Sequence, residues 1–200
     1  MITHAVGIAL APNSSTESGV AVREIASNKI IYLDKLFSMN DVSFFLENYN
    51  NIQNSVFSVS LPWDNTMLDG KWRVLSKPYQ MIHENKYFLN KDNWMQRFAT
   101  RGCDLLLNYK EEGIIINRFE VYLARQKLNL YSNYKERSSA DCKFLQSMLR
   151  TEYGFDELPQ NMMPMAQLEA IVGVLLGCEK LKNNTHEIFK FKNLEVINLK

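Results

Sequence analysis

The sequence predicts one α/β domain whose mixed sheet begins with a three-stranded antiparallel meander. Stretches 4–10, 19–25 and 29–37 are apolar or alternate like strands, and short polar turns join them. Residues 38–49 then change to the helical period, and an apolar strand follows at 55–61. A helix at this point lets the fourth strand lie parallel to the first, which favours a mixed sheet flanked by helices.

The second half of the chain continues this alternation of helices and strands. We expect a helix near 92–108, a fifth strand at 114–122 and a helix at 139–151 that is capped by Ser138 or Ser139. The long apolar stretch 165–181 predicts the last helix, and residues 188–199 alternate like a strand.

Length and composition indicate a single domain, residues 1–200. Apolar residues make up 46% of the chain and charged residues 22%, which is ordinary for a globular protein. The formal net charge is +1, so no overall field draws the protein to nucleic acid or to acidic lipid. A nucleic-acid partner would therefore need a local basic patch.

Cysteine and hydropathy patterns point to a cytoplasmic protein without a membrane segment. The three cysteines show no CxxC pair, which argues against a zinc site and a disulfide framework. The apolar run 168–176 is shorter than the roughly 20 residues that a bilayer requires. The first residues lack the basic start of a signal peptide. The three histidines are scattered and make no metal-binding spacing.

Residues 63–101 differ from the rest of the chain. They contain all three tryptophans, and their seven basic and four acidic residues give a local charge of +3. We interpret them as a long excursion from the sheet, with its densest cluster at Lys71, Trp72 and Arg73. Aromatic side chains can stack on bases and basic ones can contact phosphates, so nucleic-acid binding is one hypothesis. A protein-binding face is the other, because Trp, Tyr and Arg are common interface anchors.

Four stretches in sequence resemble a family of predicted nucleases of the ribonuclease H-like superfamily, related in fold to Holliday-junction resolvases. They are VGIA at 6–9 with GVAV at 19–22, VSLPW at 59–63, RFEVY at 118–122 with YK at 134–135, and LEAI at 168–171 with Gly177 beyond. The resemblance covers nearly the whole chain. It implies a ribonuclease H-like mixed sheet and, in active members, cleavage of phosphodiesters with two metal ions.

The metal-binding positions that the resemblance implies are largely lost. The acid of the first strand falls on Ala9, the acid of the fourth strand falls on Ser60, and the acid of the last helix remains as Glu169. Neither a methyl group nor a neutral hydroxyl replaces a carboxylate, which is the ligand that Mg²⁺ prefers. The resemblance thus favours the fold and argues against the activity.

A relocated catalytic site is the alternative. Asp64 and Glu120 could join Glu169, with Glu169 and Asp64 as ligands of Mg²⁺ or Mn²⁺. Asp64 also fits a turn residue, and Glu120 also fits a structural acid paired with an arginine.

Three functional hypotheses follow from the sequence. The favoured one is a degenerate nuclease-family domain that binds nucleic acid or a protein partner without cutting. The others are an active metal-dependent nuclease with relocated ligands, and a structural subunit whose closing residues 188–199 supply an edge strand for another chain. The sequence determines neither the oligomeric state nor the identity of the partner.

Overall fold

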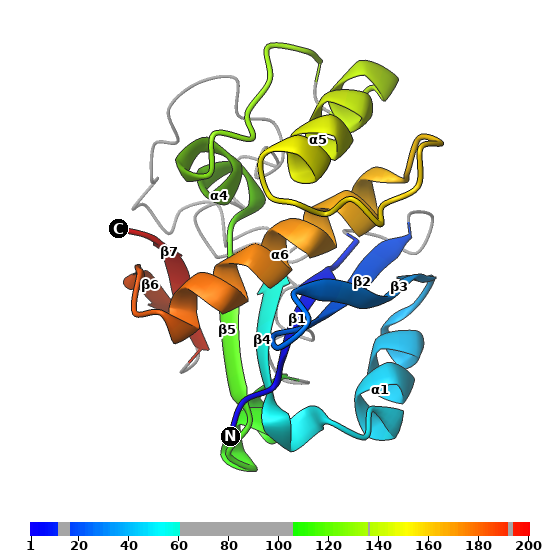
Figure 1. Cartoon of the computed structure of the whole chain (residues 1–200). Coiled ribbons are helices and arrows are strands. Elements are labelled where there is room, and N and C mark those ends of the chain that lie inside the picture. Colours follow the sequence, from blue (N-terminus) through cyan, green and yellow to red (C-terminus); the bar gives the residue numbers. More distant parts are fainter. Residues whose placement is uncertain (12–16, 61–105, 136, 192–193) are drawn as a thin grey trace, which may run out of the picture.

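The computed structural model describes residues 1–11, 17–60, 106–135, 137–191 and 194–200 (Figure 1). Its strands are β1 (His4–Ala9), β2 (Ser18–Glu24), β3 (Lys29–Leu36), β4 (Ser55–Ser60), β5 (Ile115–Phe119), β6 (Thr185–Phe191) and β7 (Leu194–Leu199). Its helices are α1 (Met39–Asn48), α4 (Val121–Lys127), α5 (Ser139–Thr151) and α6 (Met165–Leu181), with a short 3-10 turn, η1, at Ile52–Asn54.

The described strands form one mixed sheet in the order β3-β2-β1-β4-β5-β7-β6. Strands β1, β2 and β3 pair antiparallel, whereas β4 lies parallel to β1, β5 parallel to β4, and β7 parallel to β5. The antiparallel meander followed by parallel strands confirms the predicted fold class, a ribonuclease H-like α/β sheet flanked by helices.

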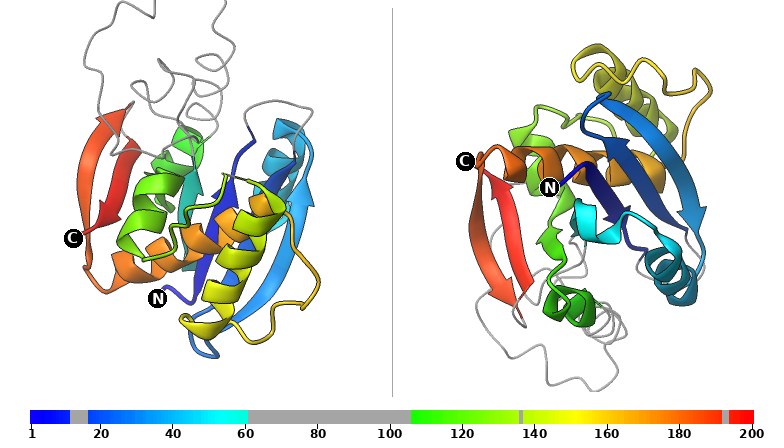
Figure 2. Two further views of the ribbon diagram at one scale, coloured as in Figure 1. Left: turned by 90° about the horizontal axis from the view of Figure 1, so that it is seen from above. Right: turned by 60° about the horizontal axis from the view of Figure 1, so that its bottom comes forward.

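Helices cover both faces of the sheet. Helix α6 runs across one face, with α4 and α5 packed against it (Figure 1). Helix α1 and the helical turn at 106–111 lie on the opposite face (Figure 2). Each face has its own buried apolar cluster, and the two clusters share no residue. The sheet therefore separates two cores, and α6 is the helix that forms the larger one.

Two serine caps fix where the helices begin. The Ser38 hydroxyl accepts a hydrogen bond from the Asp41 amide, and the Asp41 carboxylate accepts one from the Ser38 amide in return. Ser138, one of the two caps that the sequence left open, accepts from the Asp141 amide at the start of α5. These contacts satisfy amide groups that a helix leaves unpaired at its first turn.

Close approach between α6 and the sheet depends on glycine. A Cβ atom on Gly7 of β1 would lie 1.8 Å from the Ala170 carbonyl oxygen, and one on Gly19 of β2 would lie 2.0 Å from the Ala166 carbonyl oxygen. Because both obstacles are backbone atoms of α6, a side chain at either position would push the helix off the sheet.

We therefore expect Gly7→Ala to lower the free energy of unfolding by about 3 kcal/mol or more, as overpacking of a closed core does. Gly177→Ala on α6 is the matched control, because its Cβ would meet Ser58 Oγ at 3.3 Å and the helix prefers Ala. The control should change the stability by less than about 1 kcal/mol. Urea unfolding measures both, and equal losses would contradict the packing argument.

The structure corrects two predicted elements. The fifth strand, predicted at 114–122, is β5 and ends at Phe119; residues 121 and 122 instead begin helix α4. Residues 188–199, predicted as one strand-like stretch, fall in the hairpin of β6 and β7, whose outer strand β6 is the sheet edge. Of the helix predicted near 92–108, the part up to 105 lies outside the described residues.

No helix within the described ranges is long and apolar enough to cross a membrane.

Candidate functional site

The parallel strands β1, β4 and β5 end side by side at one edge of the sheet. Ala9 pairs with Ser60, and Ser60 pairs with Phe119, so the last residues of the three strands form one row. Glu120 follows this row directly. Ligand sites of open α/β sheets form at this end of the strands.

Alternation along β4 turns Ser60 toward α6. A Cβ on Gly177 of α6 would lie 3.3 Å from Ser58 Oγ, so Ser58 faces this helix, and Ser60 shares its side of the strand. Both serines are fully buried, and neither hydroxyl has a hydrogen-bond partner within the described part of the chain. The positions that the resemblance assigned to the first and fourth strands thus lie together under α6.

Glu169 is buried in the face of α6, with 1% of its surface exposed. Its carboxylate oxygen Oε2 lies 3.4 Å from a guanidinium nitrogen of Arg137, whose side chain is 29% exposed. Burial raises the pKa of Glu169, and the positive charges of Arg137 and Arg125 oppose that rise. The last-helix carboxylate is therefore present and lies beside an arginine.

Glu120 caps α4. Its Oε2 accepts a hydrogen bond of 2.9 Å from the Leu123 amide, while Oε1 is buried without a partner among the described residues. Burial raises the pKa of Glu120 to about 8; the Leu123 hydrogen bond lowers it, and the negative charge of Glu169 adds to the rise. Glu120 and Glu169 are thus close enough to interact, and Glu120 is mostly protonated at neutral pH.

A buried ion pair fixes the chain beside Glu169. Arg125 donates two hydrogen bonds to Asp141, of 2.6 and 3.2 Å, and both side chains are 2% exposed. The Ser132 hydroxyl and the Arg137 amide also donate to this carboxylate, at 2.7 and 3.0 Å. Burial acts to raise the pKa of Asp141, but the hydrogen bonds from Arg125 and Ser132 outweigh it and hold the pKa below its usual value.

These residues do not fit a pair of divalent cations. A two-metal site needs several carboxylates around ions about 4 Å apart. Here Ala9 and Ser60 supply none, and Glu169 is already paired with Arg137. In the described ranges, no three His, Cys, Asp or Glu side chains group as metal ligands would.

The structure tests the predicted site residues only in part. It brings Ala9, Ser60, Glu120 and Glu169 to one corner of the sheet. Asp64, Lys71, Trp72 and Arg73 lie outside the described residues.

The sequence interpretation missed the basic residues of this corner, Arg125 and Arg137, and their acidic partner. One signal could have found the partner. Asp141 lies on the same helix face as Cys142, Leu145 and Leu149, which are apolar and buried. A carboxylate within an apolar helix face needs a cation or several donors.

No protein-family model matches the chain, and a comparison with curated protein sequences finds no relative.

Proposed function

We propose that this chain is a ribonuclease H-like domain that binds nucleic acid and does not cleave it. One observation carries the proposal. Ala9 and Ser60 are paired at the ends of β1 and β4, where the resemblance implies carboxylates, while the carboxylate of Glu169 is paired with Arg137. The corner keeps the geometry of the fold without the negative charge that two divalent cations require.

The distribution of charge on α4 and α5 supports nucleic acid as the partner. Residues 125–151 hold six basic and two acidic residues, a net charge of +4. One of the two acids, Asp141, is buried against Arg125, whereas Lys127, Lys135 and Lys143 are exposed. Exposed cations attract a phosphate backbone.

An exposed aromatic side chain lies within this basic stretch. Tyr134 is 57% exposed, and its ring packs edge-on against Phe144 with the ring centroids 6.5 Å apart. A tyrosine held in this way offers a surface on which an unpaired base can stack. Single-stranded nucleic acid therefore fits this surface better than a protein partner does, because a protein interface would favour fewer exposed lysines.

Paired binding and cleavage assays test this function. Labelled single-stranded DNA, RNA, duplex and branched DNA are incubated with the protein in Mg²⁺, Mn²⁺ or a chelator, with Glu169→Gln alongside. We expect binding in all three conditions, weakening as salt rises, and no cleavage above that of the variant. Metal-dependent cleavage that Glu169→Gln abolishes would overturn the proposal in favour of a nuclease with relocated ligands. Absence of binding to every nucleic acid would also overturn it.

Restoring the missing carboxylates gives a second test. We expect the double variant A9D/S60D to gain a Mn²⁺ site with Glu169, because the two positions are adjacent and face the same helix. Mn²⁺ should then raise its melting temperature and leave that of the wild type unchanged, since a ligand stabilises only a fold that binds it. At a hundredfold excess over the dissociation constant, the gain would be about 2.7 kcal/mol. An equal Mn²⁺ response in both proteins would contradict the loss of the site.

A further inference from the structure

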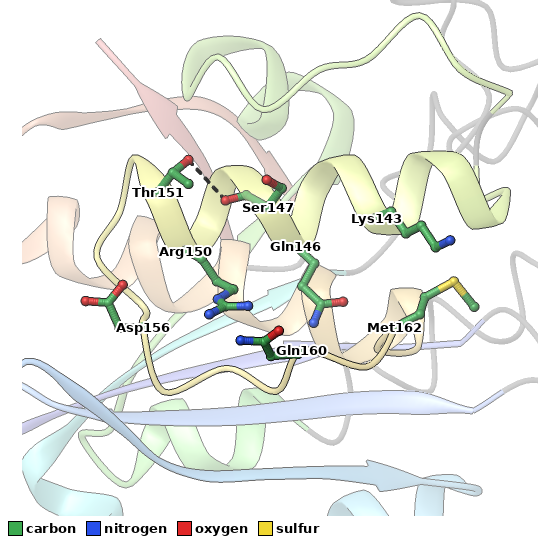
Figure 3. Close-up of a pocket in the computed structure, with 8 residues that line it drawn as sticks. All are labelled: Lys143, Gln146, Ser147, Arg150, Thr151, Asp156, Gln160 and Met162. Carbon is green, nitrogen blue, oxygen red and sulfur yellow. Dashed lines mark hydrogen bonds between the residues drawn. The ribbon is translucent and has the colours of Figure 1, made fainter.

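A pocket of about 380 Å³ lies between the outer face of α5 and the chain that leads to α6 (Figure 3). Lys143, Ser147 and Arg150 line it from the helix, and Asp156, Gln160 and Met162 line it from the facing chain. None of these residues belongs to the corner of Ala9, Ser60, Glu120 and Glu169. The volume is in the range of small-molecule sites.

The wall of the pocket is fixed by one buried side chain. Gln146, 5% exposed, donates through Nε2 to the carbonyl oxygens of Pro159 and Asn161, and accepts through Oε1 from the Met163 amide at 2.9 Å. Both ends of the Gln146 amide are therefore used to attach the facing chain to α5. A pocket held open in this way loses little freedom when it binds a ligand.

The charges in the pocket favour an anion. Lys143 and Arg150 are seven residues apart on α5, so about 10 Å separates their backbones along the helix axis, a distance that two long, flexible side chains can close by turning toward each other. Figure 3 shows the Arg150 guanidinium at the centre of the pocket near Gln160, and Asp156 on the opposite side from Lys143. Two cations against one carboxylate leave a net charge of +1, and a guanidinium is well suited to phosphate.

The rest of the pocket suits the remainder of a nucleotide. A phosphate group alone would fill only a small part of the volume. Gln160 carries an amide that can donate to and accept from the edge of a base, and Met162, 49% exposed, offers an apolar thioether to its face. We propose that this pocket binds a nucleotide, with Lys143 and Arg150 on its phosphate.

The nucleotide can be a free molecule or one unit of a strand, and the test distinguishes the two. Titration calorimetry is carried out with adenosine 5′-monophosphate, uridine 5′-monophosphate, adenosine and inorganic phosphate, and fluorescence anisotropy with a labelled oligonucleotide. We expect at least one monophosphate to bind and adenosine to bind at least about tenfold more weakly. Arg150→Gln and Lys143→Gln should each lower the affinity for the monophosphate about tenfold. Lys200→Gln is the matched control, since Lys200 is exposed and lies outside both the pocket and the basic stretch 125–151.

Each outcome decides the proposal. Lys143 is exposed, so Lys143→Gln tests the site even if Arg150→Gln is unstable. Oligonucleotide binding that both pocket variants weaken would place a strand in the pocket, whereas monophosphate binding without oligonucleotide binding would mark a free nucleotide as the ligand. In the latter case the proposed nucleic-acid function fails while the pocket assignment stands. Three results would overturn the assignment. Neither monophosphate binds, or both pocket variants bind the monophosphates as tightly as the wild type does. The third is that inorganic phosphate binds as tightly as the monophosphates.

Discussion

Glu120→Gln is expected to flatten the dependence of stability on pH between about pH 4.5 and pH 8. The pKa of Glu120 rises from 4.5 to about 8 in the folded protein, so the folded state holds a proton that the unfolded state releases in this interval. The contribution of the Glu120 carboxyl group to the free energy of unfolding is fully present below pH 4.5 and is lost as pH rises through about 8. The whole effect corresponds to about 4–5 kcal/mol of unfolding free energy.

Urea unfolding at pH 5, 7 and 9 measures the effect. Glutamine keeps an oxygen that can accept the hydrogen bond from Leu123 but carries no charge, so the variant should be the more stable protein above pH 8. Glu111→Gln, at an exposed position, is the matched control and should keep the slope of the wild type. A variant at Glu120 with an unchanged slope would show that this carboxyl group is already ionised in the fold.

Asp141→Asn is expected to lower the free energy of unfolding by about 3–5 kcal/mol at neutral pH. The substitution leaves the guanidinium of Arg125 buried without its countercharge, which is the costly way to break an ion pair. It also weakens the acceptor of the hydrogen bonds from Ser132 and from the Arg137 amide. Thermal and urea unfolding give the loss directly.

A double variant separates the buried charge from general damage to the core. Arg125→Met removes the guanidinium and fills its volume with an apolar chain, so adding it to Asp141→Asn should recover at least about 1 kcal/mol of the loss. If the two losses simply add, the ion pair is not the source of the instability. Ser43→Ala on the half-buried side of α1 controls for the loss of a single polar group, and should cost less than about 1 kcal/mol.

The pair also explains the position of Arg137. Its amide donates to Asp141, and its backbone has the left-handed value φ 57°, which costs energy for any residue other than glycine. The Asp141 carboxylate thus stabilises a turn that brings the Arg137 guanidinium to Glu169. Loss of the pair should release Arg137 and alter the corner as well as the stability.

Periodicity and capping alone predict most of the described part of the fold. The helices 139–151 and 165–181 begin and end where their patterns predicted, and the meander of β1, β2 and β3 follows from short alternating stretches. Such features depend on neighbours in the sequence, which is why the sequence records them. That neither Ala9 nor Ser60 is an acid, where the resemblance implies one, was likewise visible from residue identity alone.

Tertiary structure decided what local patterns could not. Residues 118–122 have the aromatic and branched side chains of a strand, yet the Glu120 carboxylate caps a helix there and ends β5. The pairing of Glu169 depends on Arg137, 32 residues away, and the raised pKa of Glu120 depends on burial under distant elements. Charge pairing and desolvation act between residues that are distant in the sequence. Only the folded chain therefore shows that Glu169 is paired with Arg137 and that Glu120 accepts the Leu123 amide.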